Sequence, residues 1–315
     1  AMSEKYETIV PSEPDSGERL QWVSWLRSAA PYVHLHHGRT FVISFAGEVV
    51  ADKTLLNHLV MDVSLIASMG MRVVLVHGSR PQIEELMGLR KLEGQFYKGV
   101  RITGPQELEC VKEACGETRF DIEAAFSQGL PNTPMQHSRI KVVSGNFVTA
   151  RPMGIIDGVD YLHTGVVRKV DAESIQDLLS RGNIVLVSPT GFSPTGEAFN
   201  LTTEDVATAI AVAIHADKLI LSVGVDGVRV RGEKQQDLTA QQAQALIQSK
   251  QVDDEDVYNL GYALRAIKGG VDRVHIVPYA MDGSILTELF THDGVGTMIS
   301  TSTSVTVPTI ASNTV

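Results

Sequence analysis

Two apolar strands, each followed directly by a glycine turn and a helix, limit most strongly how this chain can fold. The first spans residues 41–45 with Gly47 after it, and the second spans residues 73–77 with Gly78 after it. A parallel strand that runs into such a turn leaves unpaired backbone N–H groups at the start of the next helix, where an anion can be held. Two such units side by side predict a ligand site at the carboxyl edge of a parallel sheet.

The side chains around these turns differ from those expected of a phosphate-handling enzyme. The first strand has Ser44 where such an enzyme would need a lysine, and its turn carries the anionic Glu48. The second turn carries the bulkier Ser79 and Arg80. Because a transferring phosphoryl group is stabilised by positive charge, we expect loops that keep a phosphate-binding shape but have lost that chemistry.

Composition excludes several classes of function. The 315 residues carry a formal net charge of −10, which argues against nucleic acid or an anionic membrane as a partner, since phosphates are held by surplus Lys and Arg. No signal peptide or membrane span is visible in the sequence. Cys110 and Cys115 fit neither a disulfide framework nor a zinc pair, and they suit a reducing, cytoplasmic location.

Strands and helices alternate along almost the whole chain, and this rhythm predicts one twisted, mostly parallel α/β sheet with helices on both faces. We expect helices at residues 18–30, 55–69, 83–90, 105–115, 120–129, 204–215, 240–249, 260–268 and 285–290. We expect strands at residues 41–45, 73–77, 100–103, 140–148, 167–170, 184–188, 219–223, 274–277 and 297–300. Glycines around the strands at 140–148 and 167–170 favour an antiparallel flap there.

Both ends of the chain are expected to be loose. Residues 1–17 are polar and rich in Pro, Ser and Glu, and Ala1-Met2 reads as a cloning remnant. Residues 301–315 are rich in Ser and Thr without a helical period, as in a linker or a disordered tail. The folded domain is therefore predicted to span residues 18–300.

Several motifs in a fixed order give this chain a resemblance to a known family. They include FVISFAGE, VVLVHGSRPQIEEL, YKGVRITGPQELECV, GEAFNLTTEDVATAIA and HIVPYAMDGSILTELFTHDGVGT. The chain resembles the amino acid kinase (carbamate kinase-like) fold, and above all the N-terminal domain of bacterial N-acetylglutamate synthases, with acetylglutamate kinase as a catalytic cousin. The resemblance implies an open, mainly parallel, eight-stranded sheet between helix layers. It also implies an N-lobe over residues 18–190 for an amino-acid substrate and a C-lobe over residues 191–300 for ATP in the kinase.

Departures from the kinase pattern suggest that this chain has no kinase activity. The kinase uses one lysine on its first strand, a second in a late helix and an aspartate that organises them; the matching positions here are Ser44, Asn259 and Glu204. The resemblance leaves a vestigial substrate pocket of Gly47, Gly78, Arg101 and Asn200. The alternative is an active acetylglutamate kinase in which Lys53, Lys218 or Lys268 replaces the lost cations.

The resemblance to the synthases also implies that catalysis and regulation belong to different domains. In them a fused acetyltransferase domain makes N-acetylglutamate from acetyl-CoA and glutamate, in the first step of arginine biosynthesis. Only fifteen residues follow Ser300, too few for that domain, so we expect it to be absent and this chain to hold no cofactor. The chain is then either an excised regulatory domain or a stand-alone partner of an acetyltransferase subunit.

The ligand that the resemblance implies for such a domain is L-arginine, as a feedback signal. A guanidinium is a planar fork of five donors that suits a carboxylate and carbonyl groups. Glu288 and the glycine turn after it would supply these, while Tyr32 would close the site from the N-terminal helix. The expected arginine-binding residues are Tyr32, His275, Thr287, Glu288, Gly294 and Gly296. The alternative is that Glu288 is a solvated helix carboxylate beside a plain turn.

The N-terminal helix is expected to join subunits. By resemblance it interlaces between dimers and produces a hexamer, and Trp22 and Trp25 would be costly to expose on a monomer. The alternative is that these tryptophans pack on their own domain, in which case they give no reason to expect a subunit interface. A further alternative is an oligomerisation scaffold without a small-molecule ligand. His34, His36 and His37 have no carboxylate at metal spacing, so we expect ordinary solvated or capping histidines and no metal site.

Overall fold

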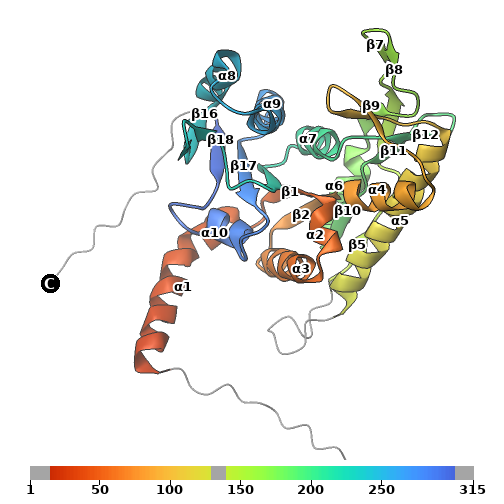
Figure 1. Ribbon diagram of the computed structural model, residues 1–315. Coiled ribbons are helices and arrows are strands. Elements are labelled where there is room, and N and C mark those ends of the chain that lie inside the picture. Colours follow the sequence, from red (N-terminus) through yellow and green to blue (C-terminus); the bar gives the residue numbers. More distant parts are fainter. Residues whose placement is uncertain (1–14, 129–139, 302–315) are drawn as a thin grey trace, which may run out of the picture.

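The computed structural model describes residues 15–128 and 140–301, and its centre is an eight-stranded sheet (Figure 1). Its strands are β1 (Thr40–Phe45), β2 (Arg72–His77), β5 (Val142–Val143), β10 (Ile184–Val187), β13 (Lys218–Val223), β16 (Asp237–Thr239), β17 (Arg273–Pro278) and β18 (Thr297–Ser300). In space they follow the order β16-β18-β17-β13-β1-β2-β10-β5, and neighbours are parallel except for the antiparallel pair β17 and β18. The predicted open, mainly parallel sheet is confirmed.

Helices cover both faces of this sheet, because successive side chains of a strand point to opposite sides. Val42 belongs to the core under α6, α7, α8 and α9, whereas Phe41, Ile43 and Phe45 belong to the core under α2, α3, α5 and α10. The helices have the following bounds: α1 (Ser16–His36), α2 (Gly47–Ala51), α3 (Lys53–Ser68), α4 (Arg80–Leu89), α5 (Pro105–Ser127), α6 (Ala172–Ser180), α7 (Thr203–Ala213), α8 (Ala240–Ser249), α9 (Asp254–Lys268) and α10 (Ser284–Phe290).

Helix α1 projects from the body of the molecule and is longer than predicted (Figure 1). The sequence suggested an end at residue 30, before Pro31, but the helix continues through this proline to His36. A proline inside a helix removes one backbone hydrogen bond. Here burial of Ala29 and His36 against the domain holds the last turns in place. The segment expected to be loose at 1–17 lies mainly outside the described residues, and Ser16 already begins α1.

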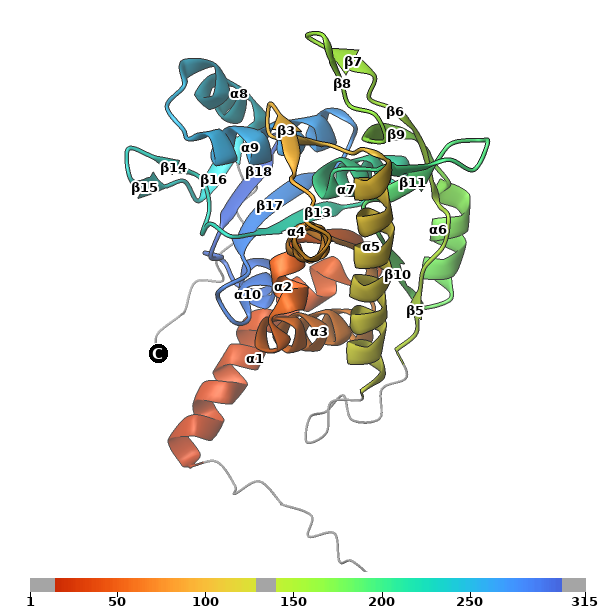
Figure 2. The same ribbon diagram turned by 45° about the vertical axis from the view of Figure 1, so that its right-hand side comes forward.

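Three other helix predictions were wrong in detail. The two helices expected at 105–115 and 120–129 are one continuous α5, because the exposed Gly116 does not break it; Gly129 lies outside the described residues (Figure 2). Helix α6 was missed, although the Asp171 side chain caps it by accepting from the Ser174 N–H. Helix α9 begins at Asp254 rather than at residue 260, and Asp253 caps it in the same way.

The predicted flap is a separate four-stranded sheet beside the end of the central sheet. It has the order β12-β11-β6-β9, formed by β6 (Val148–Pro152), β9 (Gly165–Val170), β11 (Thr190–Phe192) and β12 (Ala198–Asn200). Its β6 and β9 are antiparallel, as expected. The strand predicted at 140–148 is divided between β5 of the central sheet and β6 of the flap.

Three short hairpins complete the described part: β3 (Gln95–Tyr97) with β4 (Val100–Ile102), β7 (Ile155–Ile156) with β8 (Val159–Asp160), and β14 (Arg229–Val230) with β15 (Glu233–Lys234). The short extended piece predicted at residues 100–103 thus corresponds to β4. Within residues 15–128 and 140–301, every helix is too short or too polar to cross a bilayer. The tail predicted at 301–315 lies almost wholly outside the described residues.

Candidate functional site

The two glycine turns meet at the carboxyl edge of β1 and β2, as predicted. The Gly78 N–H donates to the Phe45 carbonyl at 2.7 Å. A Cβ atom on Gly78 would lie 2.8 Å from the Gly47 nitrogen, and one on Gly47 would lie 2.9 Å from Pro81 Cδ and 3.0 Å from Ser79 Cα. Only glycine therefore allows the two backbones to come this close.

Arg101 and Asn200, the other members of the predicted vestigial pocket, are joined through two threonines. The Asn200 amide donates to Thr103 Oγ1 at 3.1 Å, Thr103 and Thr164 share a 2.7 Å hydrogen bond, and Thr164 donates to the Arg101 carbonyl. The Arg101 guanidinium is buried over the Phe96 ring, 4.6 Å from its centre. Burial lowers its pKa, although Glu84 at 3.6 Å opposes this. The structure thus connects these two residues.

The three positions that depart from the kinase pattern hold no positive charge. Ser44 is buried on β1 between Val76 and Leu221 of the neighbouring strands. Glu204 lies in the first turn of α7, 3.4 Å from the Tyr258 hydroxyl of α9, and burial raises its pKa. Asn259 is buried on α9, and its Nδ2 has no hydrogen-bond partner among the described residues.

The three lysines considered as substitutes for the lost cations lie away from the glycine turns. Lys218 opens β13 opposite Phe41, at the amino edge of the sheet, whereas the glycine turns lie at its carboxyl edge. Lys268 ends α9, which brings the chain back to the amino end of β17. Lys53 is exposed at the start of α3. None of these three lysines therefore lies at the glycine turns.

A second cluster of charged groups lies under α10 at the amino-terminal half of β13 and β17. Lys218 Nζ donates to His275 Nε2 at 3.2 Å, and His275 Nδ1 donates to Glu288 Oε1 at 2.9 Å. Burial and the nearby Lys218 lower the pKa of His275 to about 4, so its ring is neutral and bridges a cation and an anion. Burial and Arg273 lower the pKa of Lys218 to about 8.

Glu288 is held by the turn that follows α10. Its Oε2 accepts from the Val295 N–H at 2.7 Å and from the Gly296 N–H at 2.9 Å. Burial favours the neutral acid, yet the hydrogen bonds from His275 and these two amides keep the pKa of Glu288 below its usual value. Glu288 is therefore not a solvated helix carboxylate.

The two glycines of this turn are required by its closeness to α10 at Gly294 and to β17 at Gly296. Gly294 has φ +62°, and a Cβ atom there would lie 2.4 Å from Glu288 Oε2. A Cβ atom on Gly296 would overlap the Ile276 carbonyl. Thr287 is half-buried and donates to the Gly283 carbonyl at 2.9 Å, which satisfies its hydroxyl inside α10.

The end of α1 reaches this cluster. His36 Nε2 donates to the Leu289 carbonyl of α10 at 2.8 Å, and its ring packs edge-on against Phe41 and Phe290. Burial lowers the pKa of His36 to about 4, so this histidine is not solvated; of the two expectations, the capping contact is the one that it makes, with a carbonyl in the last turn of α10. Tyr32, one turn earlier, is half-buried against the same core as α10.

Five of the six residues assigned by resemblance to an arginine site therefore lie on β17, α10 and the turn after it, with Tyr32 on the helix that packs beside them. Sequence reasoning did not include Lys218 in this group. The available signal was the segment ADKLILSV, in which a lysine opens a strand that is otherwise apolar. Only the pairing of β13 with β17 shows that this lysine reaches His275.

An open, mainly parallel sheet with paired glycine turns at its carboxyl edge and helices on both faces is typical of the doubly wound α/β class of proteins. The profile of the amino acid kinase family matches residues 39–278, and the chain belongs to this family. A carbamate kinase from Giardia lamblia shares the fold, with a TM-score of 0.65 at 13% identity over 84% of this chain and 99% of that chain.

Two closer relatives are named for acetyl transfer. The amino-acid acetyltransferase of Ralstonia nicotianae is 55% identical over 288 residues, which are 91% of this chain and 64% of that protein. The N-acetylglutamate synthase of Neisseria gonorrhoeae, solved with coenzyme A and N-acetyl-glutamate, has a TM-score of 0.82 at 35% identity, over 90% of this chain and 64% of that chain. The same enzyme with coenzyme A and L-arginine has a TM-score of 0.81, over 89% and 66%. This chain spans about 64% of the length of these curated relatives.

Proposed function

We propose that this chain is the arginine-binding regulatory domain of an N-acetylglutamate synthase and has no kinase activity of its own. The observation that supports it best is the buried row Lys218, His275 and Glu288 beneath α10, beside the end of α1. A relative with 35% identity has been solved with coenzyme A and L-arginine. In this proposal, transfer of the acetyl group from acetyl-CoA to glutamate belongs to an acetyltransferase domain or subunit outside the described residues.

The row holds one group of each charge that an arginine molecule would need as partners, with Glu288 and Lys218 on opposite sides of the His275 ring. In this proposal Glu288 offers a carboxylate to the guanidinium, and Lys218 offers a cation to the α-carboxylate. A guanidinium binds a carboxylate through two parallel N–H donors, which gives direction as well as charge complementarity. In this proposal the ring of Tyr32 covers the ligand from α1.

The test is a calorimetric titration with L-arginine, run beside ATP, together with an assay of ATP consumption. We expect heat with arginine, and no acetylglutamate-dependent consumption of ATP even at high protein concentration, because Ser44 and Asn259 cannot stabilise a transferring phosphoryl group. Turnover like that of ordinary kinases would establish the kinase alternative. If arginine gave neither heat nor a thermal shift, and ATP were not consumed, the result would favour an oligomerisation scaffold without a ligand.

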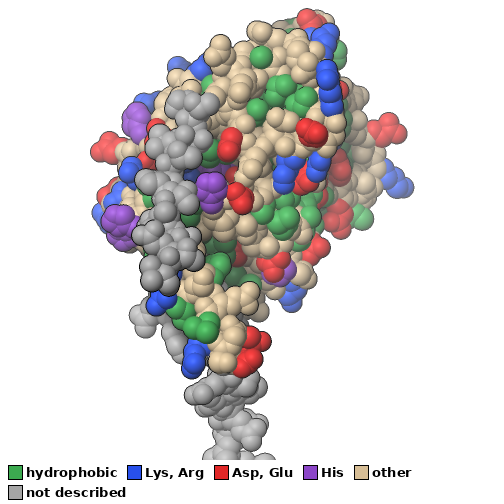
Figure 3. Space-filling view, turned by 90° about the vertical axis from the view of Figure 1, so that its left-hand side faces the viewer, with side chains coloured by type: hydrophobic (Ala, Val, Ile, Leu, Met, Phe, Trp, Pro, Cys, Tyr) green, Lys and Arg blue, Asp and Glu red, His purple; other side chains and the backbone are tan. Residues whose placement is uncertain are grey.

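Helix α1 is expected to join subunits into a larger ring. Its projecting part carries hydrophobic side chains (Figure 3), and Trp22 and Trp25 are each more than half exposed, so they do not pack on their own domain. An exposed apolar surface of this kind is typical of an interface. A variant that starts at Tyr32 should elute as a dimer, whereas the full chain should elute above dimer size. An unchanged particle mass, measured by light scattering, would rule out this role for α1.

A further inference from the structure

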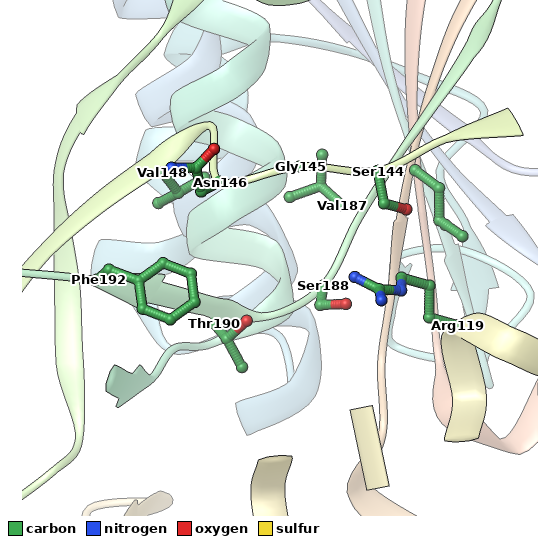
Figure 4. A pocket seen from close by; sticks show the side chains of 10 residues that line it. Arg119, Ser144, Gly145, Asn146, Val148, Val187, Ser188, Thr190 and Phe192 are labelled. Atoms are coloured by element: carbon green, nitrogen blue, oxygen red, sulfur yellow. The ribbon is translucent and has the colours of Figure 1, made fainter. Parts of the chain in front are cut away.

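A small pocket lies where β10 and the flap meet the side of α5, away from the Glu288 cluster. It is a cavity of about 80 Å³. Polar atoms reach it from Arg119 of α5, from Ser144 and Asn146 before β6, and from Ser188 and Thr190 after β10 (Figure 4). Val148, Val187 and Phe192 form its apolar side. The kinase-like positions and the predicted arginine residues do not line it, so the proposed function gives it no role.

The Ser188 hydroxyl in this pocket is committed to a buried histidine. His77 Nε2 lies 2.8 Å from Ser188 Oγ, and His77 Nδ1 lies 3.0 Å from the Gly78 carbonyl. Because a carbonyl can only accept, this network assigns the ring proton to Nδ1, and Ser188 then donates to Nε2. Burial lowers the pKa of His77 to about 4, so the ring is neutral at physiological pH. Ser188 thus turns acceptor lone pairs toward the cavity.

Arg119 and Ser144 supply two of the hydrogen-bond donors that line the pocket. Ser144 Oγ is inaccessible to solvent and has no hydrogen-bond partner among the described residues, although a buried hydroxyl without a partner is costly. Among the described residues Arg119 forms an ion pair with Glu123, one turn further along α5, at 3.9 Å, which is too long for a hydrogen bond. Figure 4 shows the Arg119 guanidinium reaching toward the Ser188 hydroxyl, with the Ser144 hydroxyl on the same side of the pocket. None of the ten lining residues carries a carboxylate.

We propose that this pocket binds a small monocarboxylate with a short apolar tail, of the acetate or propionate class. Its carboxylate would accept hydrogen bonds from the Arg119 guanidinium and from the Ser144 hydroxyl. Its tail would lie against Val148 and Phe192. One guanidinium balances one negative charge, and the apolar half of the lining disfavours phosphate, which is hydrophilic on every side. The chain as a whole carries a net charge of −10 and repels anions, so the attraction in this pocket comes from the Arg119 guanidinium.

The site is testable by saturation-transfer NMR on the methyl resonances of acetate and propionate, with the full chain and at constant ionic strength. We expect saturable transfer from the wild type, stronger for propionate. Arg119→Gln should weaken binding by about tenfold or more, the scale of one charge-assisted hydrogen bond. Ser144→Ala should weaken it less. Phe192→Ala should remove the preference for propionate.

The matched control is Arg181→Gln, which removes an exposed arginine paired with Asp177 at the end of α6. It should leave carboxylate binding unchanged, and thermal melts should confirm that all variants fold. Equal binding in Arg119→Gln and the wild type, or displacement of propionate by an equal concentration of phosphate, would overturn the proposal. Arginine binding should be intact in Arg119→Gln, because the Glu288 cluster lies at the other edge of the sheet; this result separates the two sites.

Discussion

Glu288→Gln is expected to weaken L-arginine binding by about 10- to 150-fold, which corresponds to roughly 1.5–3 kcal/mol for a hydrogen bond to a charged group. The variant keeps the shape of the side chain and removes its charge. In the wild type, Glu288 accepts from His275, Val295 and Gly296. A glutamine must turn its NH₂ group toward at least one of these donors, so it cannot reproduce the arrangement even without ligand. Isothermal calorimetry with both proteins measures the difference.

Citrulline and a matched variant are the controls for this experiment. Citrulline has the shape of arginine without the guanidinium charge, so it should raise the melting temperature of the wild type far less than arginine does. Glu85→Gln removes an exposed carboxylate on α4 and should leave arginine affinity unchanged. If Glu288→Gln bound arginine as tightly as the wild type and melted at a similar temperature, the arginine site would have to lie elsewhere.

The fold could be predicted where hydrophobic period and turn residues agree. The strands at β1, β2, β13 and β17 are apolar on both faces, and the sequence located each of them to within a residue or two. The errors came where packing overrides a local rule. Pro31 lies inside α1 because the last turns are buried, and Gly116 is tolerated in α5 because Cys115 and Thr118 on either side are buried in the core.

The candidate site was harder to predict, because its parts come together only through strand pairing. Glu288 and the glycines after it could be proposed from the family resemblance, since they lie close together in sequence. Lys218 could not, since it meets His275 across 57 positions of sequence and only after β13 and β17 align in register. Sequence reasoning considered this lysine only as a substitute for a kinase cation, which its place at the amino edge disfavours.

A buried carboxylate on α3 makes the stability of this domain depend on pH. Asp62 is only 9% exposed, beside a small cavity that Ser222 and Tyr279 also line. Burial and the nearby Asp282 raise its pKa from 3.8 to about 7. Two other titratable groups line the same cavity, Tyr279 and His58, and His58 lies 3.4 Å from Asp282. In the unfolded chain Asp62 loses its proton near pH 4, so between pH 4 and 7 the folded state binds more protons. The stability that this group contributes is therefore present at low pH and is lost as the pH rises through 7.

Asp62→Asn should make the protein more stable at pH 8 and leave its stability nearly unchanged at pH 4. A shift of about three pKa units corresponds to an upper limit of about 4 kcal/mol, and we expect roughly 1–3 kcal/mol, because local relaxation and water reduce the cost of a buried charge. Urea unfolding at both pH values measures the gain. Asp282→Asn should give a smaller gain at pH 8 by removing the second cause of the shift, and Glu85→Gln, on an exposed part of α4, should give none. A gain from Asp62→Asn that is equal at pH 4 and pH 8 would contradict this account, because a packing effect does not depend on the proton.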